Sequence, residues 1–334
     1  NYMISRYGPQ GLENVTVYDG IKNYLDNQVE VAYAQGCKIK DANWPDSEIV
    51  PTALTDDEKQ GIDEAVRLAA DCDVIIAALG EDESCTGESK SRTDLNLPGR
   101  QQQLLEALYA TGKPVVLVLI NGQPLTINWA ARNIPSILEA WFPNQLGGVA
   151  IAQTLFGDYN PGGRLTVTFP KTTGQIEFNF PFKPGSQDGQ YFSGPNGSGN
   201  TRVNGALYPF GFGLSYTTFD YSNLQIHQVT KHTQSPLTVS VDITNTGKRA
   251  GDEVVQLYLR DVVASVIPYD SQLRGFERIH LQPGEKKKVT FTLTPEDLEI
   301  LDRHMEWTVE PGKFEVLVGA SSEDIRSKGE FSVE

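Results

Sequence analysis

Cysteine is scarce in this chain, and its scarcity excludes a protein built on disulfides. The 334 residues include only three cysteines, and no two of them form a CxxC pair. A disulfide framework or a cysteine-based zinc site needs more cysteines at closer spacing. Cys37 and Cys72 flank apolar runs, which is typical of small buried residues. Cys85 lies among carboxylates, which would raise the pKa of its thiol and weaken it as a nucleophile.

Histidine is also rare, and the common metal and cofactor motifs are missing. The four histidines all lie in the C-terminal third, without HExxH or another paired ligand spacing: His227, His232, His280 and His304. The sequence contains no phosphate-binding P-loop, no GxSxG nucleophile motif and no GxGxxG dinucleotide motif. We therefore expect neither a metal site nor an organic cofactor.

Positive charge is in the minority, and long apolar runs are absent. Lys and Arg total 28 against 43 Asp and Glu, so the formal net charge is −15. A surface that binds nucleic-acid phosphates or anionic lipids needs clustered Lys and Arg, so neither nucleic acid nor a membrane is an expected partner. No apolar run approaches the roughly twenty residues of a bilayer span. The chain has no signal peptide and starts at Asn1 without methionine, as expected of a processed or truncated protein.

Alternating strand and helix patterns fill the first half of the chain. Strand patterns occupy residues 29–34, 74–79, 114–120, 136–141 and 165–169. Helix patterns occupy residues 15–25, 55–70, 98–110, 125–131 and 146–156. The run PVVLVLI at 114–120 is apolar throughout, which indicates a central parallel strand buried on both faces. The fold class is therefore α/β, with a mostly parallel α/β sandwich over residues 1–169.

The second half of the chain begins with a connection and ends as an all-β domain. Residues 170–213 are rich in Pro and Gly, and their aromatic residues predict an ordered loop that packs on a core: Phe178, Phe180, Phe182, Tyr191 and Phe192. Two-residue alternation then marks strands at 237–244, 253–260, 288–293 and 313–318. Residues 214–334 therefore predict a sandwich of about seven strands, and the lack of a cysteine pair favours a fibronectin type III-like domain.

A long acidic loop between a strand and a helix is the main candidate site. Residues 80–98, GEDESCTGESKSRTDLNLP, follow the strand at 74–79 and carry carboxylates at Glu81, Asp82, Glu83 and Glu88. Loops between such elements usually run about two to six residues, so one this long needs a functional reason. Open α/β sheets place their chemistry at this position. The alternative is a solvated surface loop.

Several long motifs resemble a known enzyme family. GESKSRTDLNLPGRQQQLLEAL, GKPVVLVLINGQPLTI, ILEAWFPNQLGGVAIAQTLFGDYNPGGRLTVTFP and NGALYPFGFGLSYTTF resemble family-three glycoside hydrolases of the bacterial periplasmic β-glucosidase type. LRGFERIHLQPGEKKKVTFTL and MEWTVEPGKFEVLVGASSEDI resemble the fibronectin type III-like domain at the end of such enzymes. The resemblance implies a retaining, exo-acting β-glycosidase that hydrolyses terminal non-reducing β-D-glucosyl residues, with β-xylosides as the alternative substrate.

The resemblance also implies a divided active site. Enzymes of this family carry an N-terminal (β/α)8 barrel before the α/β sandwich. The resemblance implies that this chain lacks the barrel and also the first strand of the sandwich. The family's nucleophile is an aspartate on the barrel, so no nucleophile is expected in this chain, and the chain alone is expected to be inactive. The expected partners are an oligosaccharide or an aryl or alkyl β-glycoside and the barrel of the same protein, in the periplasm or outside the cell.

Within the acidic loop, the resemblance assigns the general acid/base to Glu88 in the motif GESKSRTDLNLP. Glu81 is the rival, because some relatives use a glutamate directly after the glycine that ends the strand, as Gly80 does here. Arg92 and Asp94 are expected to order the loop or to contact substrate, since an Arg–carboxylate pair would stiffen it. Retaining glycosidases need two carboxyl groups roughly 5 to 5.5 Å apart, and the acid must hold its proton near neutral pH.

Two other functions remain open from the sequence. The two domains could form a carbohydrate- or partner-binding module without catalysis. A doubly wound nucleotide-binding protein is the third interpretation, and the missing glycine-rich phosphate turn argues against it.

Overall fold

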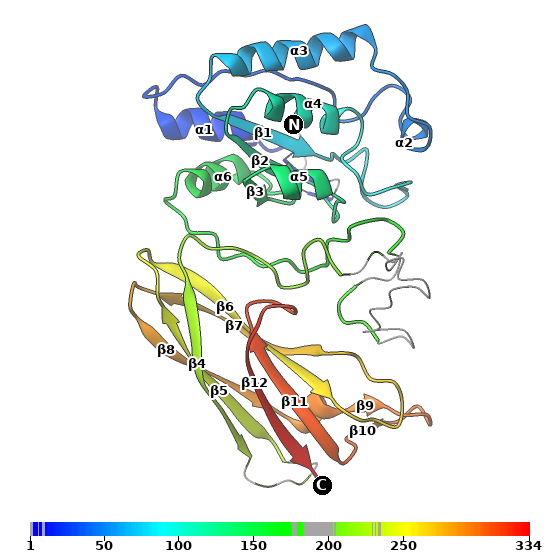
Figure 1. The fold of residues 1–334 in the computed structure, drawn as a ribbon, viewed down its shortest axis with the longest axis vertical. Coiled ribbons are helices and arrows are strands. Elements are labelled where there is room, and N and C mark those ends of the chain that lie inside the picture. Colours follow the sequence, from blue (N-terminus) through cyan, green and yellow to red (C-terminus); the bar gives the residue numbers. More distant parts are fainter. Residues whose placement is uncertain are drawn as a thin grey trace, which may run out of the picture. The chain divides into compact units, whose positions relative to one another are not determined.

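The computed structural model divides the chain into two compact units (Figure 1). It describes residues 3–5, 7–8, 11–175, 179–183, 203, 205–228, 230, 232 and 235–334. The first unit comprises Asn1–Tyr159 and Pro170–Gly174, and the second comprises Asn160–Phe169 and Gln175–Glu334. In the described ranges, no helix has both the length and the apolar content needed to cross a bilayer.

A three-stranded parallel sheet forms the centre of the first unit. Its strands lie in the order β1 (Ile75–Gly80), β2 (Val115–Ile120) and β3 (Ser136–Glu139), with Ala78 opposite Val118 and Leu119 opposite Glu139. The central strand β2 is buried along nearly its whole length, as its apolar sequence predicts. This parallel sheet with helices confirms the predicted α/β class for this part of the chain.

Helices flank this sheet (Figure 1): α1 and α6 share an apolar core with β2, and α4 and α5 contact each other through aromatic rings. Their bounds are α1 Val17–Leu25, α2 Asp46–Ile49, α3 Asp56–Ala70, α4 Gln101–Ala110, α5 Asn128–Asn133 and α6 Gly147–Leu155. A capping box of Thr55 and Glu58 starts α3, as the sequence TDDE predicts. Helices α1 and α6 touch at glycines, since a Cβ on Gly20 would lie 2.1 Å from the Gly148 carbonyl oxygen. The small residues of α6 thus permit the close packing that its sequence predicts.

Two predicted strands of this half are wrong. Residues 29–34 lie in no strand, and a groove of about 500 Å³ is lined by residues of this segment and of β1. Tyr33 and Gln35 line this groove together with Ala78 and Leu79 of β1. Residues 165–169 belong to the second unit and form only a single bridge, between Phe169 and Tyr208. Alternating apolar residues favour a strand, but a strand also needs a hydrogen-bonding neighbour.

The second unit is an antiparallel β-sandwich, which confirms its predicted all-β class. One sheet has the order β4 (Phe219–Gln228), β5 (Leu237–Asn245) and β8 (Lys286–Leu293). The other has the order β12 (Ile325–Val333), β11 (Gly312–Gly319), β6 (Gly251–Asp261) and β7 (Gln272–Leu281). A short hairpin of β9 (Ile300–Leu301) and β10 (Trp307–Thr308) follows the one-turn helix α7 (Pro295–Leu298). Alternate residues of both sheets fill one core, as the two-residue period requires.

Part of the predicted connection packs onto the sandwich. The ring of Phe180 stacks on that of Phe210 with centroids 4.6 Å apart, and the carbonyl of Phe182 accepts the Asp270 N–H at 3.0 Å. Phe178, Tyr191 and Phe192 lie outside the described residues. The described aromatic residues thus contribute to packing, as predicted.

Candidate active site

The carboxyl ends of the three parallel strands bring polar side chains together. Glu81 follows β1, Asn121 follows β2 and Glu139 is the last residue of β3. Glycine is required at position 80, because its φ is 140° and a Cβ there would lie 2.0 Å from the Ile120 carbonyl oxygen. The backbone of β1 therefore runs directly alongside β2 until it delivers Glu81 to this edge, where α/β sheets bind ligands.

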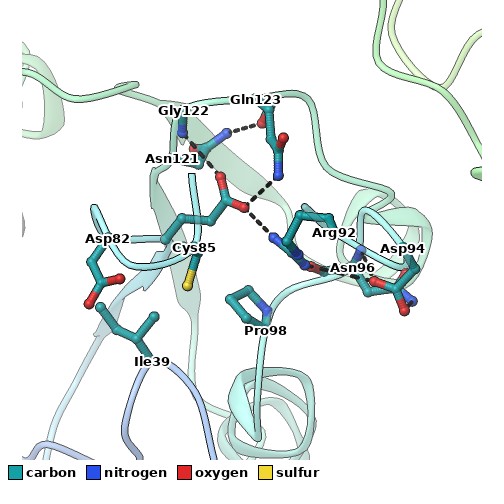
Figure 2. A network of polar contacts seen from close by, with 12 residues as sticks. Ile39, Asp82, Cys85, Arg92, Asp94, Asn96, Pro98, Asn121, Gly122 and Gln123 are labelled. Carbon is teal, nitrogen blue, oxygen red and sulfur yellow. Dashed lines mark hydrogen bonds and ion pairs between the residues drawn. The ribbon is translucent and has the colours of Figure 1, made fainter. Parts of the chain in front are cut away.

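Glu81 is buried and receives donors from two other segments. Its side chain is fully enclosed and contacts the Arg92 guanidinium, the Gln123 side-chain amide at 2.8 Å and the Gly122 N–H at 3.1 Å. Arg92, Gln123 and Gly122, which Figure 2 labels, all donate to this carboxylate. Burial raises the pKa of Glu81, and these three donors oppose that rise. The arrangement fixes the start of the acidic loop to the end of β2.

Arg92 connects Glu81 to the rest of the loop. Its side chain is 5% exposed, and its nitrogens donate to Glu48 Oε1 at 3.0 and 3.1 Å and to the Asn96 carbonyl at 2.7 Å. Asp94 lies 3.7 Å from the same guanidinium and accepts the Asn96 N–H at 2.8 Å. One buried cation therefore holds both arms of the loop and the short helix α2.

Glu48 is a site residue that the sequence did not reveal. Its Oε2 accepts the Thr93 hydroxyl at 2.6 Å, and its Oε1 accepts the Trp44 indole N–H at 2.8 Å. Burial alone would raise the pKa of Glu48, but the hydrogen bonds from Thr93 and Trp44 and the charge of Arg92 together lower it. Glu48 therefore remains ionised and serves as the second counter-ion of Arg92.

Gln101 closes the base of the loop. Its Oε1 accepts the Gly80 N–H at 2.7 Å, and its Nε2 donates to the carbonyls of Gly80 at 2.7 Å and Ile39 at 3.0 Å. The side chain is 2% exposed, so these backbone groups are satisfied without water. The first residue of α4 thus ties the end of β1 to the segment that contains Ile39.

Glu88 lies at the tip of the loop and is exposed. The Gly87 carbonyl accepts the Lys90 N–H at 3.1 Å, and Ser89 has a φ of 62°, so Glu88 and Ser89 occupy the two central positions of a tight turn. The Glu88 N–H donates to the Tyr7 hydroxyl at 2.8 Å, which fixes the backbone at this point. The structure therefore brings Glu81, Arg92 and Asp94 into one network and places Glu88 at the turn beyond it.

Glu139 is a third carboxyl group at this edge, and it too was missed from the sequence. Burial raises the pKa of Glu139 to about 8, with a smaller contribution from the charge of Glu81. Its Oε1 accepts the Trp141 N–H at 2.9 Å. Its buried Oε2 and the buried Oδ1 of Asn121 lack hydrogen-bond partners within the described ranges. A protonated Glu139 removes the charge from this pocket and gives Oε2 a hydrogen to donate.

The three cysteines show no features of a nucleophile or of a metal site. Cys85 is fully buried, and burial is the main reason that the pKa of its thiol is raised, with Asp82 adding to it. The sequence predicted that neighbouring carboxylates raise the pKa of Cys85, but its desolvation is the larger cause. Cys37 and Cys72 are half-buried rather than buried. In the described part of the chain, no three His, Cys, Asp or Glu side chains are grouped to hold a metal ion.

The missed residues were partly visible in the sequence. Asn121, Gly122 and Gln123 follow the apolar run of β2, and Glu139 ends β3, so the rule for parallel strand ends points to them. Glu48 and Gln101 carry no such signal. Glu48 lies in the one-turn helix α2, which no sequence period marks, and Gln101 resembles any polar residue in the first turn of a helix.

This fold and site define a class of protein. A parallel α/β sheet with a carboxylate-bearing loop at its carboxyl edge, followed by an antiparallel β-sandwich, is the two-domain architecture that the resemblance to family-three glycoside hydrolases implies. The model of the glycosyl hydrolase family 3 C-terminal domain matches residues 3–216, and that of the fibronectin type III-like domain matches residues 253–322. The chain belongs to glycosyl hydrolase family 3.

Known relatives share most of this chain. A β-xylosidase of Formosa agariphila is 44% identical over 92% of it, and a periplasmic β-glucosidase of Salmonella typhimurium is 40% identical over 96%. A solved β-glucosidase structure from Erythrobacter marinus matches 99% of the chain with a TM-score of 0.86 and 38% identity, and the match covers 44% of that protein. The chain spans 40% and 43% of the length of the two curated relatives.

Proposed function

We propose that this chain supplies the general acid/base of a retaining β-glycosidase, and that Glu88 carries the proton. The observation that carries the proposal is the contrast between the two candidate glutamates. Glu81 is buried and engaged by Arg92, Gln123 and the Gly122 N–H, so it cannot reach a glycosidic oxygen without breaking that network. Glu88 projects from a turn whose backbone is held by the Lys90 N–H to Gly87 carbonyl bond and by the bond from the Glu88 N–H to the Tyr7 hydroxyl.

In this proposal, the nucleophile and the surface that buries the acid belong to another part of the same protein. A retaining mechanism needs a nucleophilic carboxylate opposite the acid, and the relatives are more than twice as long as this chain. A general acid must keep its proton near neutral pH, and burial against a second domain favours the protonated form. Docking of an N-terminal barrel onto the exposed loop tip would provide both the nucleophile and the burial.

The substrate of the proposed enzyme is a terminal non-reducing β-D-glucosyl residue of an oligosaccharide or of an aryl or alkyl glycoside. A β-xyloside is the alternative, because the similar proteins include both β-glucosidases and β-xylosidases. A periplasmic or secreted location is supported by the name of the Salmonella typhimurium relative.

Substitution of Glu88 in the full-length protein tests the role of the acid. Glu88→Gln is expected to slow hydrolysis of alkyl β-glycosides by about 10²–10⁴-fold, since their leaving oxygen needs a proton, and to affect dinitrophenyl glycosides far less. Glu83→Gln is the matched control, because Glu83 is an exposed carboxyl group on the same loop. Normal turnover of alkyl glycosides by Glu88→Gln, together with an inactive but fully stable Glu81→Gln, would transfer the role to Glu81.

We also propose that a further parallel strand completes the α/β sheet in the groove beside β1. Among the described strands, β1 is an edge strand, and its residues Ala78 and Leu79 line the groove together with Tyr33 and Gln35. An edge strand has unpaired backbone N–H and C=O groups that an added strand can satisfy. Hydrogen exchange of the β1 amides should slow in a longer protein that includes the preceding residues. Equal exchange in both proteins would contradict this proposal.

A further inference from the structure

A groove in the β-sandwich unit lies far along the chain from the acidic loop. Its volume is about 510 Å³, within the range of small-ligand sites. The end of β6, the start of β7, helix α7 and the β9–β10 hairpin contribute to its walls. Figure 1 shows β9 and β10 beside one end of β11, which contributes Phe314 to the groove. All of these elements belong to the second unit.

Aromatic rings are displayed in this groove rather than buried in the sandwich core. Trp307 is 67% exposed and Tyr269 is 37% exposed, although both residue types usually bury most of their surface. Ile267, on the same wall as Tyr269, is 62% exposed. Such rings combine a large apolar face with little conformational entropy to lose, so they form efficient platforms for ligands with an apolar face.

Polar groups of both kinds line the same groove. Arg274 donates to Gln272 Oε1 at 2.5 Å, while its Nε is buried without a hydrogen-bond partner in the described part of the chain. Burial lowers the pKa of Arg274, and the Asp297 carboxylate opposes this effect. A buried donor without an acceptor is unfavourable, and a ligand oxygen in the groove would supply the missing acceptor. Acceptors are provided by Asp261, Glu296 and Glu299.

We propose that this groove binds a neutral β-linked oligosaccharide without cleaving it. A pyranose ring presents an apolar C–H face that stacks on an aromatic ring, so two sugar units of one oligosaccharide would stack on Trp307 and on Tyr269. Each sugar hydroxyl group both donates and accepts hydrogen bonds. The carboxylates outnumber the cations in the groove, Lys183 and Arg274, so an anionic sugar or a phosphate is disfavoured. The groove would thus hold a polymeric substrate and raise its local concentration near the enzyme.

Isothermal titration calorimetry tests whether the groove binds sugar. The full 334-residue chain is titrated with cellotetraose and, separately, with xylotetraose. Saturable binding of at least one of them is expected at about millimolar affinity or better. Trp307→Ala and Tyr269→Ala should each weaken it at least about tenfold, which corresponds to 1.4 kcal/mol. Phe276→Ala is the matched control, because Phe276 is 68% exposed on β7 and does not line the groove.

Three results would overturn the proposal. They are the absence of binding by the folded chain, equal affinities of the Trp307→Ala and Phe276→Ala variants, and binding of a lysine-rich peptide in place of either sugar. Circular dichroism verifies that the variants are folded, which is expected since Trp307 is mostly exposed. Glu88→Gln should leave this binding unchanged. The proposal for the groove and the proposal for Glu88 are therefore tested independently, and either can be wrong while the other holds.

Discussion

The guanidinium of Arg92 contacts the carboxylate of Glu81, and both side chains are almost completely buried, at 5% and 0% exposed. The two residues lie on opposite arms of the acidic loop, on either side of the turn at Glu88 and eleven positions apart. A buried ion pair adds little stability compared with an apolar pair, but removal of one partner leaves an uncompensated charge in the interior. The pair therefore makes the shape of the loop depend on both residues at once.

Arg92→Met is expected to lower the free energy of unfolding by about 3–5 kcal/mol, because Glu81 and Glu48 would both lose their buried counter-ion. Urea denaturation of the 334-residue chain measures the change. Arg67→Met is the matched control, since Arg67 is exposed on α3, and its effect should stay within about 0.5 kcal/mol. Equal stability of the two variants would mean that the Arg92 network does not hold the loop.

Glu139 makes the stability of the α/β unit depend on pH. Its pKa rises from 4.5 to about 8 in the folded protein, so the unfolded chain releases this proton first as pH increases. The stabilisation from protonated Glu139 is complete below about pH 4.5 and is lost progressively up to about pH 8.

Glu139→Gln keeps the shape and removes this titration. The variant should match the original chain near pH 4.5 and exceed its stability by about 2 kcal/mol at pH 8, given about 1.4 kcal/mol per pKa unit and partial relaxation of the charged form. Denaturation at both pH values provides the comparison, with Glu64→Gln on the exposed face of α3 as the control. The raised pKa would be contradicted if the stability difference between Glu139→Gln and the original chain were the same at pH 8 as at pH 4.5.

Gly80→Ala should displace Glu81 from its position at the carboxyl end of β1. The added Cβ would meet the Ile120 carbonyl oxygen at 2.0 Å, and the φ of 140° is unfavourable for alanine. A loss of at least about 3 kcal/mol is expected, in the range of strained backbone positions and core overpacking. Gly112→Ala is the control, because Gly112 also has a positive φ, of 74°, but nothing lies within 4 Å of its added Cβ. Thermal melting should therefore separate the two variants by about 1–2 kcal/mol or more.

The 334-residue chain alone is expected not to hydrolyse glycosides. A retaining reaction needs a nucleophile opposite the acid, and the proposal places that nucleophile outside these 334 residues, with Glu88 at an exposed loop tip. An assay with an aryl β-glucoside and an aryl β-xyloside measures this directly. Turnover above buffer that disappears in Glu88→Gln would mean that a complete site exists within these two units.

Local pattern in the sequence determined most of the secondary structure. The unbroken apolar run at 114–120 allowed only a strand buried on both faces, and β2 is that strand. Strict alternation in β5 and β11 likewise fixed which side chains enter the sandwich core. These features follow from the period of one element, so they need no knowledge of its neighbours.

Only the tertiary structure decided the pairing of elements and the roles of the charged residues. Residues 29–34 alternate as β5 does, yet they remain unpaired because no described strand lies beside them. Glu48 and Arg92 are 44 residues apart and meet only because α2 packs beside the loop. Glu81 and Glu88 look equivalent in the sequence, but one is enclosed by three donors and the other lies at a turn tip. Burial and charge compensation depend on what the folded chain brings near a side chain, and no local period encodes that.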